Sequence, residues 1–155
     1  MATLHLVCGL PGAGKSTLAA RLESEYSALR LTPDEWLSRL GSEDGRDPDA
    51  RDRIEELQLE VALRTLGLGV DVVLDNGFWS RSERDAYRAR AKTAGAETAL
   101  YFLDVPKDEL KRRLELRNRA LPPHTFHVTG KDIDEWLRIF EAPTADEPGL
   151  VRIST

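Results

Sequence analysis

Apolar runs alternate with segments of helical periodicity along the whole chain. Runs bounded by glycine, proline or polar clusters predict five strands, which cover residues 3–8, 27–32, 69–77, 97–106 and 149–154. Apolar positions at helical spacing predict the intervening helices, which cover residues 15–26, 33 onward, 49–66, 80–93, 107–117 and 130–141. This alternation predicts an α/β fold, in which a parallel sheet carries helices on both faces.

Two of the predicted helices begin with a capping signal. Thr32 with Glu35, and Ser80 with Glu83, each have the spacing of a capping box, and Pro33 suits a first helical position.

The long helix over residues 49–66 follows a polar loop with two glycines. Its buried side is expected to carry Ile54, Leu57, Val61 and Leu68.

Four residues fall at the carboxyl ends of predicted strands, namely Gly9, Thr32, Asp75 and Asp104. In an open parallel sheet, ligands bind in the crevice beyond these ends. The topology therefore predicts that four separate loops meet at one crevice.

Residues 9–17 read GLPGAGKST, in which Gly9, Gly14, Lys15 and Ser16 match the phosphate-loop pattern G-x-x-x-x-G-K-[ST]. A strand precedes the loop and a helix follows it, as phosphate binding at a helix N-terminus requires. Lys15 is expected to reach the β- and γ-phosphates of a nucleotide, and Ser16 to bind Mg²⁺. The residues expected to contact the nucleotide here are Gly9, Pro11, Gly12, Ala13, Gly14, Lys15, Ser16 and Thr17.

The composition narrows the function further. The chain has 155 residues and a formal net charge of −5, so we expect one domain over residues 1–155 and no general affinity for nucleic acid. The one cysteine, Cys8, excludes an intrachain disulfide and is expected in the core. No apolar run approaches the ~20 residues that span a bilayer, and no targeting segment precedes the first strand, so we expect a cytoplasmic protein.

The phosphate loop leaves a motor, a switch and a phosphotransferase open. A guanine-reading Asn/Thr-Lys-x-Asp motif is not found, since residues 106–109 read only PKDE. A kinase needs a base for the acceptor hydroxyl, cations for the transferred phosphoryl group and a lid against water. Asp34, just after the second strand, is the candidate base, although an acid in a first helical turn is also favoured by the helix dipole.

Several arginines form the candidate lid. Arg113 and Arg117 are four residues apart and share a helix face, and Arg119 is expected in the proline-containing loop just beyond. A solvated helix face with Glu109 and Glu115 is the alternative.

The segment after the third strand is the candidate acceptor site. Asp75 ends an apolar run, as an acid that assists Mg²⁺ or holds the acceptor would, and Asn76 and Trp79 follow at the same crevice. Trp79 and Trp36 could stack on a flat acceptor, whereas core anchoring is the alternative for each.

Outside these segments, His124 and His127 are expected to be ordinary loop residues, and Asp104 a turn residue.

Four segments together, GLPGAGKST, TPDEW, VVLDNGFWS and LDVPKDELKRRLELRN, resemble the small AAA-type P-loop kinases. That group includes polynucleotide 5′-kinase domains, chloramphenicol phosphotransferase and zeta-toxin-like kinases, and the similarity runs from Leu4 to about Pro143. The resemblance implies a P-loop NTPase fold with strand order 2-3-1-4-5, and ATP and Mg²⁺ as cofactors.

The resemblance also implies roles for single residues. Asp34 falls at the position of the base, and Asp75 and Asn76 fall where these kinases hold the acceptor. Arg117 matches the lid arginine best and Arg113 next, in a lid of about residues 117–128.

One departure concerns the acceptor. Polynucleotide 5′-kinases carry an arginine one turn after the base, where this chain has Leu37, with Arg39 nearby. Together with the negative net charge, this favours a small-molecule acceptor, such as a nucleoside, an antibiotic or a sugar. A polynucleotide 5′-hydroxyl kinase and a non-catalytic or regulatory ATP-binding protein remain as alternatives.

Overall fold

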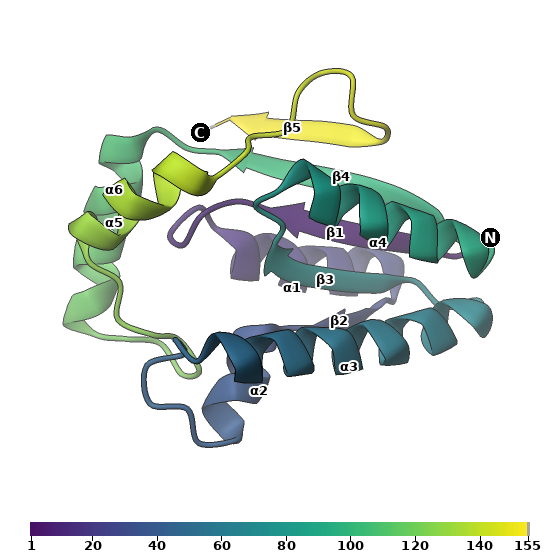
Figure 1. Cartoon of the computed structure of the whole chain (residues 1–155), viewed down its shortest axis with the longest axis horizontal. Coiled ribbons are helices and arrows are strands. Elements are labelled where there is room, and N and C mark those ends of the chain that lie inside the picture. The colour runs from purple at the N-terminus through teal and green to yellow at the C-terminus, as the bar shows by residue number, and fades with distance from the viewer. Residues whose placement is uncertain (155) are drawn as a thin grey trace.

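The computed structural model describes residues 1–154, and within them the strands form one parallel five-stranded sheet of order β2-β3-β1-β4-β5 (Figure 1). The strands are β1 (Thr3–Cys8), β2 (Leu29–Leu31), β3 (Val72–Gly77), β4 (Glu97–Asp104) and β5 (Leu150–Ser154). The helices are α1 (Lys15–Tyr26), α2 (Pro33–Arg39), α3 (Pro48–Gly67), α4 (Arg81–Thr93), α5 (Lys107–Arg119) and α6 (Gly130–Ile139). The predicted fold class and strand order are confirmed.

Helices cover both faces of the sheet. One apolar cluster packs α3 and α4 against the face to which Leu4, Leu6 and Cys8 point. A second cluster packs α1, α5 and α6 against the opposite face, to which Val7 points from the same strand. Successive side chains of a strand point to opposite faces, so β1 can be buried on both sides only if nearly every residue is apolar. Figure 1 shows α3 and α4 in front of the sheet, α1 behind it, and α5 and α6 at its left end.

The buried side of α3 differs from the predicted one. Leu57 and Val61 are exposed, and Leu68 is 82 % exposed just beyond the helix. The residues of α3 that are buried against the sheet are Ile54, Gln58, Leu59, Ala62 and Leu66. Both stripes have helical spacing, so periodicity alone does not show which one meets the sheet.

Both predicted N-cap residues stand at the starts of their helices, but only Ser80 forms a capping hydrogen bond. Ser80 Oγ accepts a hydrogen bond from the backbone N–H of Glu83 at 3.1 Å, as a cap of α4 should. Thr32 precedes α2, but its side chain makes no capping bond there. Its hydroxyl instead donates to Asp75 Oδ2 at 3.1 Å, because β2 and β3 lie side by side and end together.

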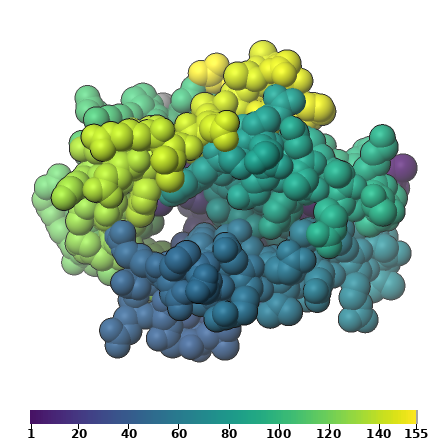
Figure 2. Space-filling model, in the orientation of Figure 1, coloured from purple at the N-terminus to yellow at the C-terminus, as the bar shows by residue number. Residues whose placement is uncertain are grey.

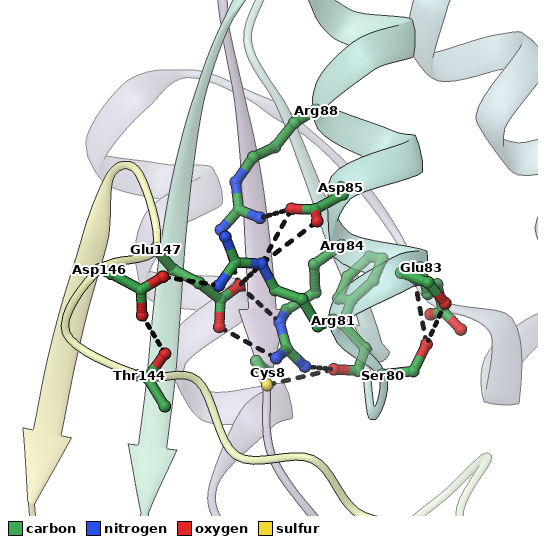
Figure 3. Close-up of polar contacts among 12 residues, drawn as sticks. Cys8, Ser80, Arg81, Glu83, Arg84, Asp85, Arg88, Thr144, Asp146 and Glu147 are labelled. Carbon is green, nitrogen blue, oxygen red and sulfur yellow. Dashed lines mark hydrogen bonds and ion pairs between the residues drawn. The ribbon is translucent and has the colours of Figure 1, made fainter.

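A buried ion pair ties the segment before β5 to α4 (Figure 3). Arg84 and Glu147 are both nearly fully buried, and the guanidinium donates to both carboxylate oxygens at 2.8 and 3.0 Å. Arg84 also donates to the backbone carbonyl of Phe78 at 2.8 Å, and Arg88 donates to Glu147 at 3.1 Å. The network therefore fixes the turn that leaves the carboxyl end of β3.

We expect Glu147→Gln to lower the free energy of unfolding by about 3 kcal/mol, because it leaves the buried Arg84 charge uncompensated. Hydrogen bonds from Arg84 and Arg88 outweigh the effect of burial and hold the pKa of Glu147 below its ordinary value of 4.5. A carboxyl whose pKa is lower in the folded state stabilises the protein above its unfolded pKa, and that stability is lost as the pH falls. Urea unfolding at neutral and acidic pH measures both effects.

Asp146→Asn is the matched control for this prediction, because Asp146 is exposed and pairs with Arg81 at the surface. It should leave the unfolding midpoint nearly unchanged. Equal midpoints for both variants and the wild type would contradict the structural role of Glu147.

Candidate active site

The phosphate loop joins β1 to α1 through two glycines with left-handed backbones. Gly12 has φ 87° and Gly14 has φ 99°, conformations that side chains rarely allow. The loop is anchored at its start, where the Gly9 N–H donates to the Gly77 carbonyl at 3.0 Å. Gly14 is the N-cap residue of α1, and no side chain caps this helix. The first N–H groups of α1 can therefore bind an anion.

Helix α5 packs closely on the phosphate loop. A Cβ added to Gly12 would lie 2.9 Å from Leu114 Cγ, so only glycine fits at this contact. Arg113 donates to the carbonyls of Gly12 and Ala13 at 3.4 Å and to Glu109 at 3.0 Å. The loop is thus held from both sides, by β3 and by α5.

Lys15 is the first residue of α1 and lies between carboxylates. Burial lowers the pKa of its ammonium from 10.5 to about 8, and the charges of Asp34 and Asp75 oppose this shift. In the described part of the chain Lys15 makes no direct ion pair. Ser16 and Thr17 follow on the same turn, and both are exposed. The lysine is thus a cation held near the loop without an anion of its own.

Asp75 lies at the carboxyl end of β3 and is only 6 % exposed. Burial raises the pKa of its carboxyl to about 6, against the charge of Lys15 and the hydrogen bond from Thr32. Oδ2 accepts that bond, while Oδ1 is buried without a partner in residues 1–154. An unsatisfied buried carboxylate oxygen is costly, which favours a ligand at this atom.

Asp34 is the second residue of α2, and its side chain is 46 % exposed. Its Oδ1 accepts a hydrogen bond from Arg51 Nη1 at 2.6 Å. Its charge acts on Lys15, on Asp75 and on Arg117, so all four groups lie in one electrostatic site. The structure therefore brings together residues from three of the predicted loops.

Arg51 is a residue of this site that sequence analysis missed. It lies in the first turns of α3 and binds both Asp34 and Glu55, the latter at 3.0 Å. Burial lowers the pKa of its guanidinium, but Asp34 and Glu55 outweigh that effect and raise it overall. In the sequence its only signal is the four-residue spacing to Glu55, which many exposed helices share.

The three arginines of the predicted lid lie in different surroundings. Arg117 is partly buried, donates to the Phe126 carbonyl at 3.1 Å and has a pKa lowered by burial, with Asp34 acting in the opposite sense. Arg119 was expected in a loop, but it is the last residue of α5 and pairs with Glu115 at 3.7 Å on an exposed surface. The helix continues two residues further than predicted, which turns Arg119 toward solvent.

The residues after Asp75 have separate contacts. Asn76 Nδ2 donates to the Tyr87 hydroxyl at 3.3 Å, and its Oδ1 is buried without a partner in residues 1–154. Trp79 Nε1 donates to the Gly9 carbonyl at 3.2 Å, and its ring lies 5.6 Å from that of Trp136. Through these contacts Trp79 supports the start of the phosphate loop. This favours core anchoring over stacking on an acceptor. Trp36 likewise packs against the core beside α3 and α4.

The segment after α5 reaches across the site to the loop before α3. Arg46 donates to Asp132 at 2.7 Å and to the His127 carbonyl at 3.3 Å, and its guanidinium lies 5.4 Å from the Trp136 ring centre. His124 Nδ1 lies 3.2 Å from Ser38 Oγ. Figure 2 shows an opening bounded by the blue segment around α2 and α3, the yellow-green α6 and the teal α4. Arg46 thus links the loop before α3 to α6.

Two residues singled out in the sequence, Asp104 at the end of β4 and Cys8 in β1, lie outside the site. Asp104 does not join the crevice, because it pairs with Arg152 of the edge strand β5, whose Nε donates to it at 2.9 Å. Cys8 is buried as expected, and burial raises the pKa of its thiol to about 12. Its thiol is therefore unreactive and packs in the core.

Comparison with solved structures shows the same fold in kinases. The APS kinase CysC of Mycobacterium tuberculosis, solved with AMPPNP and APS, is 23% identical, with a TM-score of 0.70 over 99% of this chain and 88% of that one. A gluconokinase of Sinorhizobium meliloti is 19% identical, with a TM-score of 0.66 over 99% and 81%. A chain of the Pnkp1/Rnl/Hen1 RNA repair complex is 20% identical, with a TM-score of 0.75 over 88% and 43%.

Three further findings help to place the chain. No helix among residues 1–154 has both the length and the apolar character needed to cross a membrane. No curated protein sequence matches this chain. A sequence profile of the AAA domain family, AAA_33, matches residues 4–143. The P-loop NTPase fold, the phosphate loop and this match together show that the chain belongs to the AAA domain family AAA_33.

Proposed function

We propose that the protein is an ATP-dependent phosphotransferase that moves the γ-phosphoryl group to a hydroxyl of a small-molecule acceptor. The observation that carries this proposal is the placement of Asp34, whose charge acts on the phosphate-loop Lys15 from the mouth of the same crevice. A nucleotide hydrolase needs no carboxylate there, whereas a kinase needs one to take the acceptor proton.

The residues present fit ATP with Mg²⁺. The uncapped start of α1 offers N–H groups, Lys15 offers an unpaired cation for the β- and γ-phosphates, and Ser16 offers an exposed hydroxyl to the metal. Asp75, with one unpartnered oxygen, lies where it can assist the metal shell or hold the acceptor. Bound Mg²⁺ supplies charge neutralisation for the phosphates.

In the proposed reaction, Asp34 takes the proton of the acceptor hydroxyl. Its Oδ1 is held by Arg51, while Oδ2 accepts no hydrogen bond from residues 1–154 and is free to face the acceptor. The acceptor oxygen then forms a bond to the γ-phosphorus as the bond to the ADP oxygen breaks. Lys15 and Arg117 stabilise the charge of the moving phosphoryl group, and Arg113 positions the loop from outside. Asn76 is a further contact for the acceptor.

The structural neighbours support a small acceptor. They include a kinase solved with APS and a gluconokinase, both similar over nearly the whole of this chain. A second candidate is a polynucleotide 5′-hydroxyl kinase, which the similarity to the RNA repair complex favours. Binding of that acceptor should weaken steeply with salt, since counterions are released from the phosphates, whereas a small uncharged acceptor should show little change.

We expect Asp34→Asn to lower phosphoryl transfer by about 10²- to 10⁴-fold, because the amide cannot take the hydroxyl proton. ATP binding should remain, since Lys15 and the loop are intact. Transfer of label from γ-labelled ATP to a panel of hydroxylated acceptors measures the first effect, and calorimetry measures the second. Glu35→Gln is the control, because the neighbouring Glu35 pairs with Arg30 and Arg39 away from the loop. Equal transfer by wild type and Asp34→Asn would remove Asp34 from the mechanism.

ATP affinity should fall as the pH rises above about 8, because the Lys15 pKa of about 8 means that the ammonium loses its proton there. Below that pH the lysine is charged and attracts the phosphates. Lys15→Met should bind ATP about tenfold more weakly or worse, and its affinity should be flat over the same range. Titration calorimetry across this range tests it, and a parallel pH dependence in both proteins would assign the effect to another group.

Arg46→Ala should raise the share of ATP that is hydrolysed instead of transferred. The variant loses the contacts to Asp132 and the His127 carbonyl that hold the segment after α5 over the opening, so water gains access. The ratio of free phosphate to phosphorylated acceptor measures it. Arg53→Ala, at an exposed position of α3, is the control, and an equal ratio in the two variants would show that Arg46 does not close the site.

A further inference from the structure

A group of acidic residues lies beside Asp34 and plays no part in the mechanism above. Glu55 projects from α3 and Glu83 from the first turn of α4, and their charges act on one another and on Tyr87. Tyr87 in turn accepts a hydrogen bond from Asn76 at the end of β3. We call Glu55 and Glu83, together with the neighbouring Asn76 that the mechanism above gives to the acceptor, the acidic pocket. It borders the place where the acceptor must lie, since Arg51 links Glu55 to Asp34.

The negative charge of this pocket is only partly neutralised. Arg51 is shared between Asp34 and Glu55, and Glu83 forms no ion pair with any residue of 1–154. Arg84 does not serve Glu83, because its guanidinium is bound on the other side of α4, as Figure 3 shows. The Glu55 side chain is only 18 % exposed, so its charge is poorly hydrated. Three carboxylates therefore meet one arginine.

The raised pKa values of Glu55 and Glu83 agree with a site that can take up a cation. Burial raises the pKa of Glu55 to about 7, with Glu83 and Asp52 adding to the effect and Arg51 opposing it. Burial also raises the pKa of Glu83, with Asp52 adding to it and Arg51 and Arg84 opposing. Acids that are kept close together at a cost in stability are typical of binding sites.

Unpartnered buried polar atoms are a second and independent observation. Asp75 is only 6 % exposed, and its Oδ1 has no partner among residues 1–154. The Oδ1 atom of the neighbouring Asn76 is also buried and also lacks a hydrogen-bond partner among these residues. Gln58 is fully buried on the same face of α3 as Arg51 and Glu55, and neither of its side-chain polar atoms has a partner there. The unsatisfied atoms at the end of β3 are all hydrogen-bond acceptors, so they need a ligand that donates.

We propose that the acidic pocket binds a positively charged amino group of the acceptor, so that the substrate is a hydroxylated amine such as an amino sugar or an amino alcohol. An ammonium group supplies both the missing positive charge and three hydrogen-bond donors. A carboxylated or phosphorylated acceptor would instead be repelled by Asp34, Glu55 and Glu83. The inference rests on the proposed function for the phosphoryl transfer itself, but the binding of the amine does not depend on that transfer.

The test uses the full chain and two sets of acceptors. Within each set the compounds differ mainly in whether they carry an amine, a neutral group or a carboxylate. Glucosamine, glucose and gluconate form one set, and ethanolamine, ethylene glycol and glycolate form another. Calorimetry in the presence of AMPPNP measures binding at millimolar concentrations, and γ-labelled ATP measures transfer. We expect the amine of a set to bind at least about tenfold better than its neutral and carboxylated counterparts, the value of one charge-assisted contact.

Variants then assign the effect to the pocket. Glu55→Gln and Glu83→Gln should each remove about tenfold of the amine preference while leaving AMPPNP affinity unchanged. Glu60→Gln, at an exposed position of the same helix, should change neither. Glu55→Gln should also shift thermal unfolding upward at pH above about 7, where the wild-type carboxylate is ionised, so a misfolded variant is distinguished from a specific loss.

The outcomes separate this inference from the proposed function. If amines bind with the expected dependence on Glu55 but no label is transferred to any acceptor, the proposed function fails and the amine site stands. If a neutral or carboxylated compound is phosphorylated and its amine is not, the kinase stands and the amine site is wrong. If no amine binds at millimolar concentration, or if the preference survives both substitutions, the amine site is likewise wrong.

Discussion

The site depends on one electrostatic constraint, because the charges of two carboxylates act on a single buried lysine at the phosphate loop. Lys15 reaches the carboxyl end of the sheet because a strand, a glycine turn and a helix follow one another without a break. Asp34 and Asp75 approach it from β2 and β3, and burial lowers the pKa of the lysine against their charges. Among residues 1–154, Lys15 has no direct ion pair and Asp75 keeps one oxygen without a partner, so both are available to a ligand.

The molecule contains two kinds of buried charge, and they differ in how completely they are paired. Arg84 and Glu147 satisfy one another at both carboxylate oxygens and fix the turn beyond β3. Glu55 of α3 and Glu83 of α4 are less completely paired, and burial, which their arginine neighbours only partly oppose, raises the pKa of both. Complete pairing is what a structural contact needs, whereas incomplete pairing close to a phosphate loop points to binding.

The site is assembled from both layers of the fold. Helix α5 packs on the phosphate loop from one face of the sheet, where Leu114 meets Gly12. Helix α3 reaches Asp34 from the other face through Arg51. Arg46 then links the loop before α3 to Asp132 of α6, so the two layers are joined a second time. A substitution in one helix layer can therefore alter the position of residues in the other.

The sequence by itself determined the phosphate loop, the alternation of strands and helices and the nearness of Asp34 and Asp75 to the loop, because these depend on local pattern and on strand ends that must meet. Only the tertiary structure decided which face of α3 is buried, that Thr32 binds Asp75 instead of capping a helix, and that Arg51 lies at the site. Those outcomes depend on which segments lie side by side. Helical spacing and side-chain chemistry are the same for a residue that meets a partner and for one that faces solvent.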